Sequence, residues 1–210
     1  MEYTQLTENF NGIDLNKLKT GDIILFDEKP NNFFFKTFTK LIKFWTKSIY
    51  SHCGFILQDP FGLKGLYIWE SSWHKNVYDP LDNKNKFGVQ ITPIDYYLNN
   101  YPGNVNIYIR VKSDDNISKK MLDNVQNIVN NKPYDYNLGD WICIAFGLKR
   151  RRTIKRFWCS ALVSYILCIN GDIDENTDWT MTTAKDLSSN YNTCIKWNSS
   201  YSEDLLLGYF

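Results

Sequence analysis

The sequence predicts an α+β domain in which a small, mostly antiparallel sheet packs against one central helix. Short apolar runs bounded by Gly, Pro, Asn and Asp recur along the chain, as strands separated by turns do. Residues 159–169 (CSALVSYILCI) are apolar on nearly every side and end at Asn170-Gly171, which is typical of a buried helix with a glycine stop. The 210 residues suffice for one sizeable core and show no repeat or long linker, so we expect residues 1–210 to form a single domain.

The first three strands are expected before residue 75. Residues 21–26 (GDIILF) are an apolar run that begins with a Gly-Asp turn. Residues 51–57 (SHCGFIL) and 65–73 (GLYIWESSW) predict two further strands, which a turn at residues 59–62 would join.

The middle of the chain predicts two more strands and two helices. Residues 89–92 predict a strand, and residues 93–98 a short helix with Pro93 in its first turn. Residues 105–112 (VNIYIRVK) alternate apolar and polar side chains, as a half-buried strand does. Residues 117–129 have helical apolar spacing, and Ser118 is a candidate N-cap.

Residues 31–50 form a strongly amphipathic segment. Its lysines recur at spacings of four, three and four residues, which places them on one stripe of a helix, opposite its large apolar side chains. The two sets are Lys36, Lys40, Lys43 and Lys47, and Phe34, Phe38, Leu41, Ile42 and Trp45. We expect a surface helix that packs its aromatic side on the core, in preference to one that lies in a membrane interface with its lysines toward the headgroups.

Composition and charge exclude several classes of protein. With 43% hydrophobic residues the chain is typical of globular proteins, and a net charge of +1 argues against a nucleic-acid-binding protein. The five cysteines are an odd number without a C-x-x-C pair, and there are only two histidines, so we expect neither a disulfide framework nor a metal site. The N-terminal residues do not resemble a secretory signal, and no apolar stretch approaches the length of a spanning helix.

Three residues could together carry out nucleophilic catalysis. Cys159 begins the apolar helix, where the positive end of the helix dipole would favour a thiolate. His52, at the start of a strand, could take the thiol proton, and Glu70 on the neighbouring strand could hold the imidazole in the useful tautomer. His74 shares parity with Glu70 and is the alternative third residue. Cys53 follows His52 on its strand, so we expect its side chain to point to the other face.

The order of seven segments resembles that of a known family. GDIILF, SHCGFIL, YIWESS, GVQITPIDYYL, KPYDYN, FWCSALVSYI and TTAKDL are similar to segments of the circularly permuted papain-like hydrolases. These are relatives of NlpC-type amidases and lecithin:retinol acyltransferases, with members in bacteria and large DNA viruses. In this permuted branch the histidine strand precedes the cysteine helix, as His52 precedes Cys159 here.

The resemblance implies a fold and a site. The fold would be permuted papain-like, with Cys159 as nucleophile, His52 as base and Glu70 as the orienting residue. Tyr134 and Asp135 match a family segment near the active cleft, which implies substrate-side or structural contacts for them. We expect these two residues and Trp158 to contact the substrate, with a structural role as the alternative for Tyr134 and Asp135. Family members commonly carry a glutamate two residues after the cysteine, where this chain has Ala161. Because we predict neither a signal peptide nor a spanning segment, we expect a cytoplasmic location, in the host cytoplasm or the virion if the protein is viral.

The expected function is therefore that of a cysteine hydrolase that cleaves an amide or peptide bond through a thioester acyl-enzyme, without a metal or organic cofactor. The alternatives are an acyltransferase, thioesterase or phospholipase acting on lipid acyl groups, and a catalytically silent binding or structural protein of the same fold. The partner would be a peptide, amide or acyl-lipid substrate, and the sequence does not indicate an oligomeric state.

Residues 149–156 place six cations in eight positions shortly before Cys159. A solvated loop is the expected interpretation. The alternative is a contact of Arg150, Arg151 and Arg152 with an anionic ligand or a membrane surface.

Overall fold

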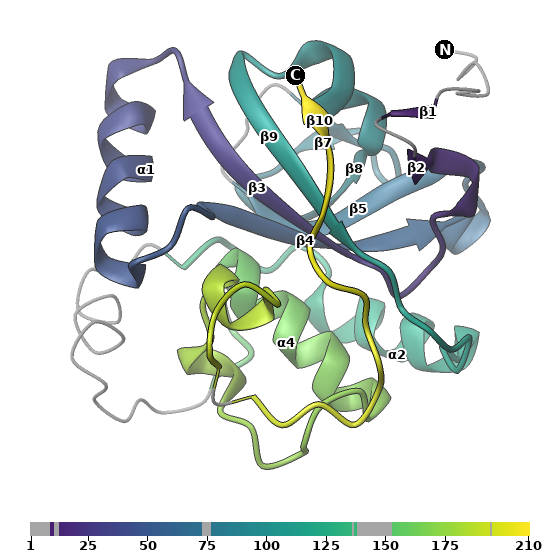
Figure 1. The fold of residues 1–210 in the computed structure, drawn as a ribbon. Coiled ribbons are helices and arrows are strands. Elements are labelled where there is room, and N and C mark those ends of the chain that lie inside the picture. The colour runs from purple at the N-terminus through teal and green to yellow at the C-terminus, as the bar shows by residue number, and fades with distance from the viewer. Residues whose placement is uncertain (1–8, 11–12, 73–76, 136, 138–152, 194) are drawn as a thin grey trace.

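The computed structural model describes residues 9–10, 13–72, 77–135, 137, 153–193 and 195–210 of the chain. It has an α+β architecture built on a six-stranded sheet in which every neighbouring pair of strands is antiparallel (Figure 1). The strand order is β10-β9-β3-β4-β5-β8. The strands are β3 (Ile23–Pro30), β4 (His52–Gln58), β5 (Leu66–Ser72), β8 (Gly88–Pro93), β9 (Gly103–Arg110) and β10 (Leu205–Tyr209).

Helices and minor elements surround this sheet. The α-helices are α1 (Phe33–Thr46), α2 (Lys119–Val129) and α4 (Cys159–Asn170). Two short hairpins pair β1 (Asn9–Phe10) with β2 (Ile13–Asp14) and β6 (Tyr78–Asp79) with β7 (Lys84–Asn85). The remaining turns are η1 (Leu15–Lys17), η2 (Pro60–Gly62), the π-helical η3 (Tyr96–Asn100), η4 (Trp179–Met181) and η5 (Ala184–Leu187).

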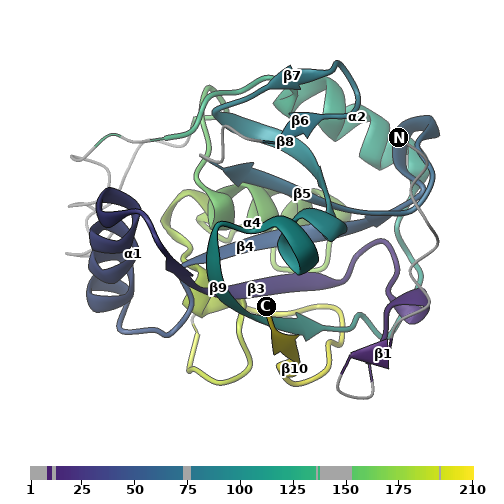
Figure 2. The same ribbon diagram turned by 90° about the horizontal axis from the view of Figure 1, so that it is seen from above.

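The sheet is buried on both faces. One face packs against α4 and α2, which lie together on the same side of the sheet in Figure 1. The other face is covered by η1 and η3, and Figure 2 shows η3 lying over the strands. In β3 the side chains of Ile23 and Leu25 enter the first core and those of Ile24 and Phe26 the second. Because both faces are covered, this strand is a continuous apolar run.

The strands predicted at residues 21–26, 51–57, 65–73, 89–92 and 105–112 are all present with shifted ends. The helix predicted at residues 117–129 begins two residues later, and its N-cap Ser118 makes no side-chain capping hydrogen bond. The predicted cysteine helix and its stop are confirmed: α4 ends at Asn170, and Gly171 follows with a left-handed φ of 83°.

One prediction about secondary structure is wrong, and one strand was not predicted. Pro93 does not begin a helix: it is the last residue of β8, where it lies opposite Tyr67 of β5, and the helical turn follows. The sequence analysis also missed β10, the edge strand that pairs with β9. Its five residues (LLLGY) become a strand only because β9 offers an edge to pair with.

The expected packing of residues 31–50 is confirmed only in part: Ile42 is buried and Phe35 and Phe38 pack against the core, but other aromatic side chains do not. The helix covers only Phe33–Thr46, and its side chains at Thr39 and Ile42 are the buried ones. The exposed fractions of Phe33, Phe34 and Phe44 are 84%, 71% and 78%. The aromatic side of α1 therefore does not as a whole face the core.

Among the described residues, no helix combines the length and apolar character that crossing a membrane requires.

Candidate active site

Cys159 is the first residue of α4 and is almost completely buried. The residues on either side of it share one anchor, the carbonyl oxygen of Thr182. Trp158 Nε1 donates a hydrogen bond to this oxygen at 3.2 Å, and Ser160 Oγ donates one at 2.7 Å. The helix start is thereby attached to the η4–η5 segment.

The segment preceding α4 is attached to the sheet. Ser71 Oγ of β5 donates a hydrogen bond to the carbonyl of Phe157 at 2.7 Å, and the backbone N–H of Asp135 donates to the same carbonyl at 3.0 Å. The N–H of Phe157 in turn donates to the carbonyl of Pro133 at 3.2 Å. These backbone contacts place Cys159 next to β4 and β5.

His52 and Glu70 form a buried pair on those two strands. His52 Nε2 lies 2.5 Å from Glu70 Oε2, and Glu70 has no exposed surface. The imidazole ring stacks on Phe26, with ring centroids 5.4 Å apart, and lies near the ring of Tyr97. The carboxylate and the aromatic rings therefore fix the orientation of the imidazole.

Three further side chains donate hydrogen bonds to Glu70. Tyr97 Oη lies 2.8 Å from Glu70 Oε2, while Thr92 Oγ1 and Gln90 Nε2 lie 2.5 Å and 3.3 Å from Oε1. A buried carboxylate is costly unless its oxygens accept hydrogen bonds, and here both do. Glu70 is thus built into the fold as an acceptor for His52.

Cys159 and His52 interact directly and change each other's ionisation. The hydrogen bond from the Cys53 thiol, followed by the charge and hydrogen bond of His52, lowers the pKa of Cys159 well below its usual value, although burial acts in the opposite direction. Burial disfavours the charged imidazole, but the charge and hydrogen bonds of Cys159 and Glu70 outweigh it and raise the pKa of His52. The arrangement favours a thiolate–imidazolium pair.

Cys53 is part of this site, contrary to the role that strand alternation suggested. As expected, the Cys53 side chain lies on the opposite face of the sheet from Phe26. That face is the one on which α4 packs, so the thiol of Cys53 is on the same side as Cys159. Burial, and then the hydrogen bond and charge of Cys159, raise the pKa of the Cys53 thiol, so it remains protonated and donates to Cys159. His52 stacks on Phe26 of the opposite core and still hydrogen-bonds to Cys159.

The three expected substrate contacts lie near Cys159 but are buried. The exposed fractions of Tyr134, Asp135 and Trp158 are 3%, 0% and 5%. Burial and then the charge of Cys159 raise the pKa of the Tyr134 hydroxyl, and both residues belong to the same core cluster. Their contact with a substrate stays a prediction. Ala161, at the position of the family's glutamate, is part of α4 and is buried in the core.

Several predicted site residues lie outside the described part of the chain. These are His74, the alternative third residue, and Arg150, Arg151 and Arg152 of the basic run. Of that run the structure describes Lys155 and Arg156, and Arg156 Nε lies 3.7 Å from Asp135 Oδ1.

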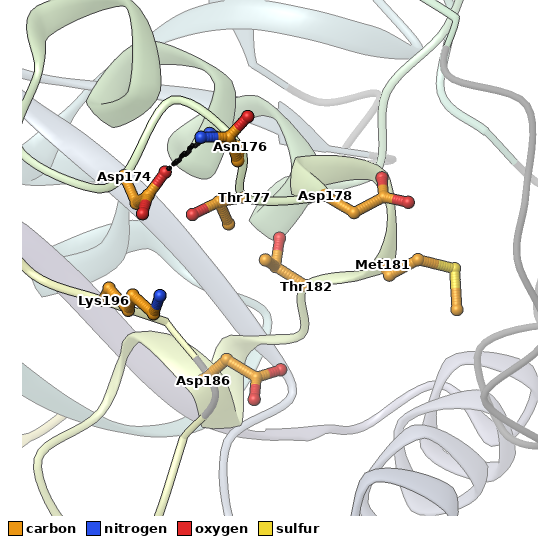
Figure 3. A pocket seen from close by; sticks show the side chains of 8 residues that line it. All are labelled: Asp174, Asn176, Thr177, Asp178, Met181, Thr182, Asp186 and Lys196. Atoms are coloured by element: carbon orange, nitrogen blue, oxygen red, sulfur yellow. Dashed lines mark hydrogen bonds between the residues drawn. The ribbon is translucent and has the colours of Figure 1, made fainter.

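A pocket of about 280 Å³ adjoins the segment that anchors Cys159 (Figure 3). It is lined by residues between Asp174 and Lys196, including Thr182. Its carboxylates already serve local turns: Asp174 accepts from Asn176, as the dashed line shows, and Asp186 accepts from Thr183. The catalytic candidates Cys159, His52 and Glu70 are not among its lining residues. We therefore regard it as a surface hollow beside the site.

No group of three or more His, Cys, Asp or Glu side chains suited to a metal ion occurs in the described ranges. No protein family model and no curated protein sequence matches the chain.

Sequence analysis did not identify Cys53, Gln90, Thr92, Tyr97 or Thr182 as site residues. A signal existed for two of them: Gln90 and Thr92 are alternate polar residues in an otherwise apolar strand, so both point to one face. Because β5 and β8 pair with Glu70 opposite Gln90, that face carries Glu70. Thr182 contributes a backbone carbonyl, for which the sequence holds no signal.

Proposed function

We propose that this protein is a cysteine hydrolase of permuted papain-like fold that cleaves an amide or peptide bond. The observation that carries the proposal is the buried chain of contacts from Cys159 through His52 to Glu70. A cysteine at a helix start, a histidine that ionises it and a carboxylate that orients the histidine form the arrangement required for thiol catalysis. The histidine strand before the cysteine helix supports the permuted fold.

In the proposed reaction, Sγ of the Cys159 thiolate bonds to the substrate carbonyl carbon. The charge that develops on the carbonyl oxygen is stabilised by backbone N–H groups at the start of α4. The C–N bond then breaks, His52 gives its proton to the leaving amine, and a thioester remains. His52 next takes a proton from water, the resulting hydroxide attacks the thioester, and Cys159 leaves as thiolate. No metal or organic cofactor takes part.

Glu70 would act through His52 without touching the substrate. Because Nε2 of His52 faces Glu70 at 2.5 Å, Nδ1 is the nitrogen that can exchange a proton with Cys159. Tyr97, Thr92 and Gln90 hold the carboxylate in place. The imidazolium formed during the reaction would be stabilised by a negative charge that needs no rearrangement.

Acyl transfer or hydrolysis on a lipid is the second candidate function. It shares the acylation step and differs in the substrate and the acceptor. The observation that favours it is the exposed apolar surface of α1, where Phe33 and Phe44 are among the most exposed large side chains.

The test is to trap the acyl-enzyme. Wild type and Cys159→Ala are incubated with activated amide, peptide and lipid acyl donors, quenched with acid and analysed by intact mass. We expect a mass increase equal to the acyl group in wild type and none in Cys159→Ala, because only the thiolate of Cys159 is activated. His52→Ala should form the acyl-enzyme at least about a hundredfold more slowly than wild type. The donor class that reacts separates the two candidate functions.

Cys168→Ala is the matched control, since Cys168 lies on the same helix and is partly exposed. It should acylate as wild type does. Wild type that forms no adduct with any donor class, or an adduct that persists in Cys159→Ala, would contradict the proposal and favour a silent protein of the same fold.

A further inference from the structure

The helix α1 carries an unusual concentration of exposed apolar side chains. Phe33, Phe34 and Phe44 are 84%, 71% and 78% exposed, and Leu41 and Trp45 are 50% and 43% exposed. We call these five residues the apolar face of α1. Ile49, which follows the helix, is 44% exposed as well. Large apolar side chains exposed in a group, and not singly, indicate a surface that binds something.

The residues of α1 divide into three faces. With about 100° per residue, the apolar face covers an arc of about 120° and the lysines a separate arc of about 60°. The third arc faces the protein: Thr39 and Ile42 are buried, and Phe35 and Phe38 pack against the core. The apolar residues of α1 thus occupy two adjoining arcs, and the core covers only one of them.

The charge of this region is entirely positive. The sequence contains no Asp or Glu between Glu28 and Asp59, a stretch that includes all of α1. Lys43 is held by Asp27 and by the carbonyl of Glu28. Lys36, Lys40 and Lys47 are exposed, and none of them forms an ion pair with a carboxylate of the described residues. An apolar arc with lysines next to it complements a layered surface that has an apolar interior and anionic groups on its outside.

The position of α1 leaves this surface accessible. Figures 1 and 2 show the helix at one end of the molecule, beside β3, projecting from the sheet and the other helices. The apolar face lies along the outside of a convex helix, and not in a groove. A convex, aromatic and cationic surface matches the soft interfacial layer of a membrane better than it matches a protein partner, which would have to supply a complementary groove.

We propose that α1 docks this protein onto an anionic phospholipid bilayer. The apolar face inserts among the acyl chains nearest the headgroups, and Lys36, Lys40 and Lys47 contact the anionic headgroups. Five residues lie between Thr46, at the end of α1, and His52, so the Cα atoms of these two residues are at most about 22 Å apart. The docking stands independently of the proposed hydrolase activity, because none of these residues contacts Cys159, His52 or Glu70.

The test is cosedimentation of the full-length chain with phosphatidylcholine vesicles, with and without phosphatidylserine. We expect wild type to bind the phosphatidylserine vesicles, and Phe34→Glu/Phe44→Glu to bind more than about tenfold less, since two charges would enter the apolar layer. Lys36→Glu/Lys40→Glu should bind the phosphatidylserine vesicles about fivefold more weakly for each lysine replaced, and should therefore lose the preference for these vesicles. Added salt should weaken binding of wild type.

The matched controls change exposed residues elsewhere in the same way. Tyr209 is 73% exposed on β10, and the side chain of Lys64 is 89% exposed. Tyr209→Glu and Lys64→Glu should bind vesicles as wild type does. Cys159→Ser should also bind normally, so a failure of the hydrolase proposal would not affect this result. The melting temperature of every variant is compared with that of wild type. We expect no change, because all the substituted residues on α1 and in the controls Tyr209→Glu and Lys64→Glu are exposed.

Two results would overturn the proposal. The first is that wild type binds neither kind of vesicle, or binds the phosphatidylserine vesicles no better than Phe34→Glu/Phe44→Glu does. The other is a wild-type dimer in sedimentation velocity that becomes monomeric in the same variant, without vesicle binding by either protein. That second result would assign the apolar face of α1 to a second copy of the chain.

Discussion

At Cys159 the ionisation of one sulfur depends on two neighbours that the sequence places side by side. His52 and Cys53 are consecutive residues of β4 whose side chains belong to opposite faces of the sheet, yet both hydrogen-bond to Cys159. This is possible because His52 is the first residue of its strand and Cys159 the first of its helix. Cys159 would thus receive an uncharged donor from one side and a cation from the other.

We expect the thiolate of Cys159 to persist well below the ordinary thiol pKa of 9.0. The pKa is lowered, so the thiolate disappears only as the pH falls through this lower value. Cys53→Ala and His52→Ala should each raise it, His52→Ala by more, because an imidazolium carries a full charge and a thiol is a weak donor. The measurement is thiolate absorbance against pH, with Cys159→Ser as the blank. A titration near 9.0 in wild type would show that the pair does not ionise in this way.

At the scale of elements, the site depends on a close approach between β8 and the segment before α4. Gly88 forms a bridge with Pro133, and Tyr134 forms one with Phe157, two residues before Cys159. A Cβ atom added at Gly88 would lie 2.2 Å from the carbonyl oxygen of Lys132 and 2.6 Å from the N atom of Tyr134. Only glycine lets these two backbones meet.

Gly88→Ala should therefore lower the free energy of unfolding by about 3 kcal/mol or more, since the clash is with backbone and φ is positive at 146°. Gly62→Ala is the control: Gly62 also has a positive φ, of 87°, but a Cβ there would meet nothing within 4 Å. We expect it to reduce stability by about 1 kcal/mol. Chemical denaturation measures the stability of both variants. Equal losses of stability would contradict the importance of the close contact between β8 and the segment before α4.

At the scale of the whole molecule, the C-terminal segment joins regions that are distant in sequence. The buried carboxylate of Asp204 accepts hydrogen bonds from Tyr50 Oη at 2.6 Å and from the N–H of Ser189 at 2.8 Å. Arg110 Nε of β9 lies 3.7 Å from the same carboxylate. After this residue the chain enters β10, so one side chain links the segment after α1, strand β9 and the loop after η5.

Asp204→Ala should lower the free energy of unfolding by about 3 kcal/mol, because it leaves the Tyr50 hydroxyl and the N–H of Ser189 without their acceptor and removes the negative charge beside Arg110. Glu203→Ala changes the exposed neighbouring carboxylate and should alter stability by less than about 0.5 kcal/mol. Urea denaturation of both variants is the measurement. Equal effects would show that Asp204 does not link these regions.

The choice of Cys159, His52 and Glu70 also drew on the resemblance of seven segments to a known family. Local pattern alone was sufficient for the α+β class, the five predicted strands, the amphipathic helix and the buried helix that begins at Cys159. Each of these depends on neighbours within one segment, which periodicity and turn residues reveal. Folding alone decided the rest: that Cys53 reaches Cys159, that residues of β8 support Glu70, that β10 pairs with β9, and that half of the apolar surface of α1 is left uncovered. The physical reason is that periodicity shows which side chains share a face of an element, whereas only packing shows what, if anything, covers that face.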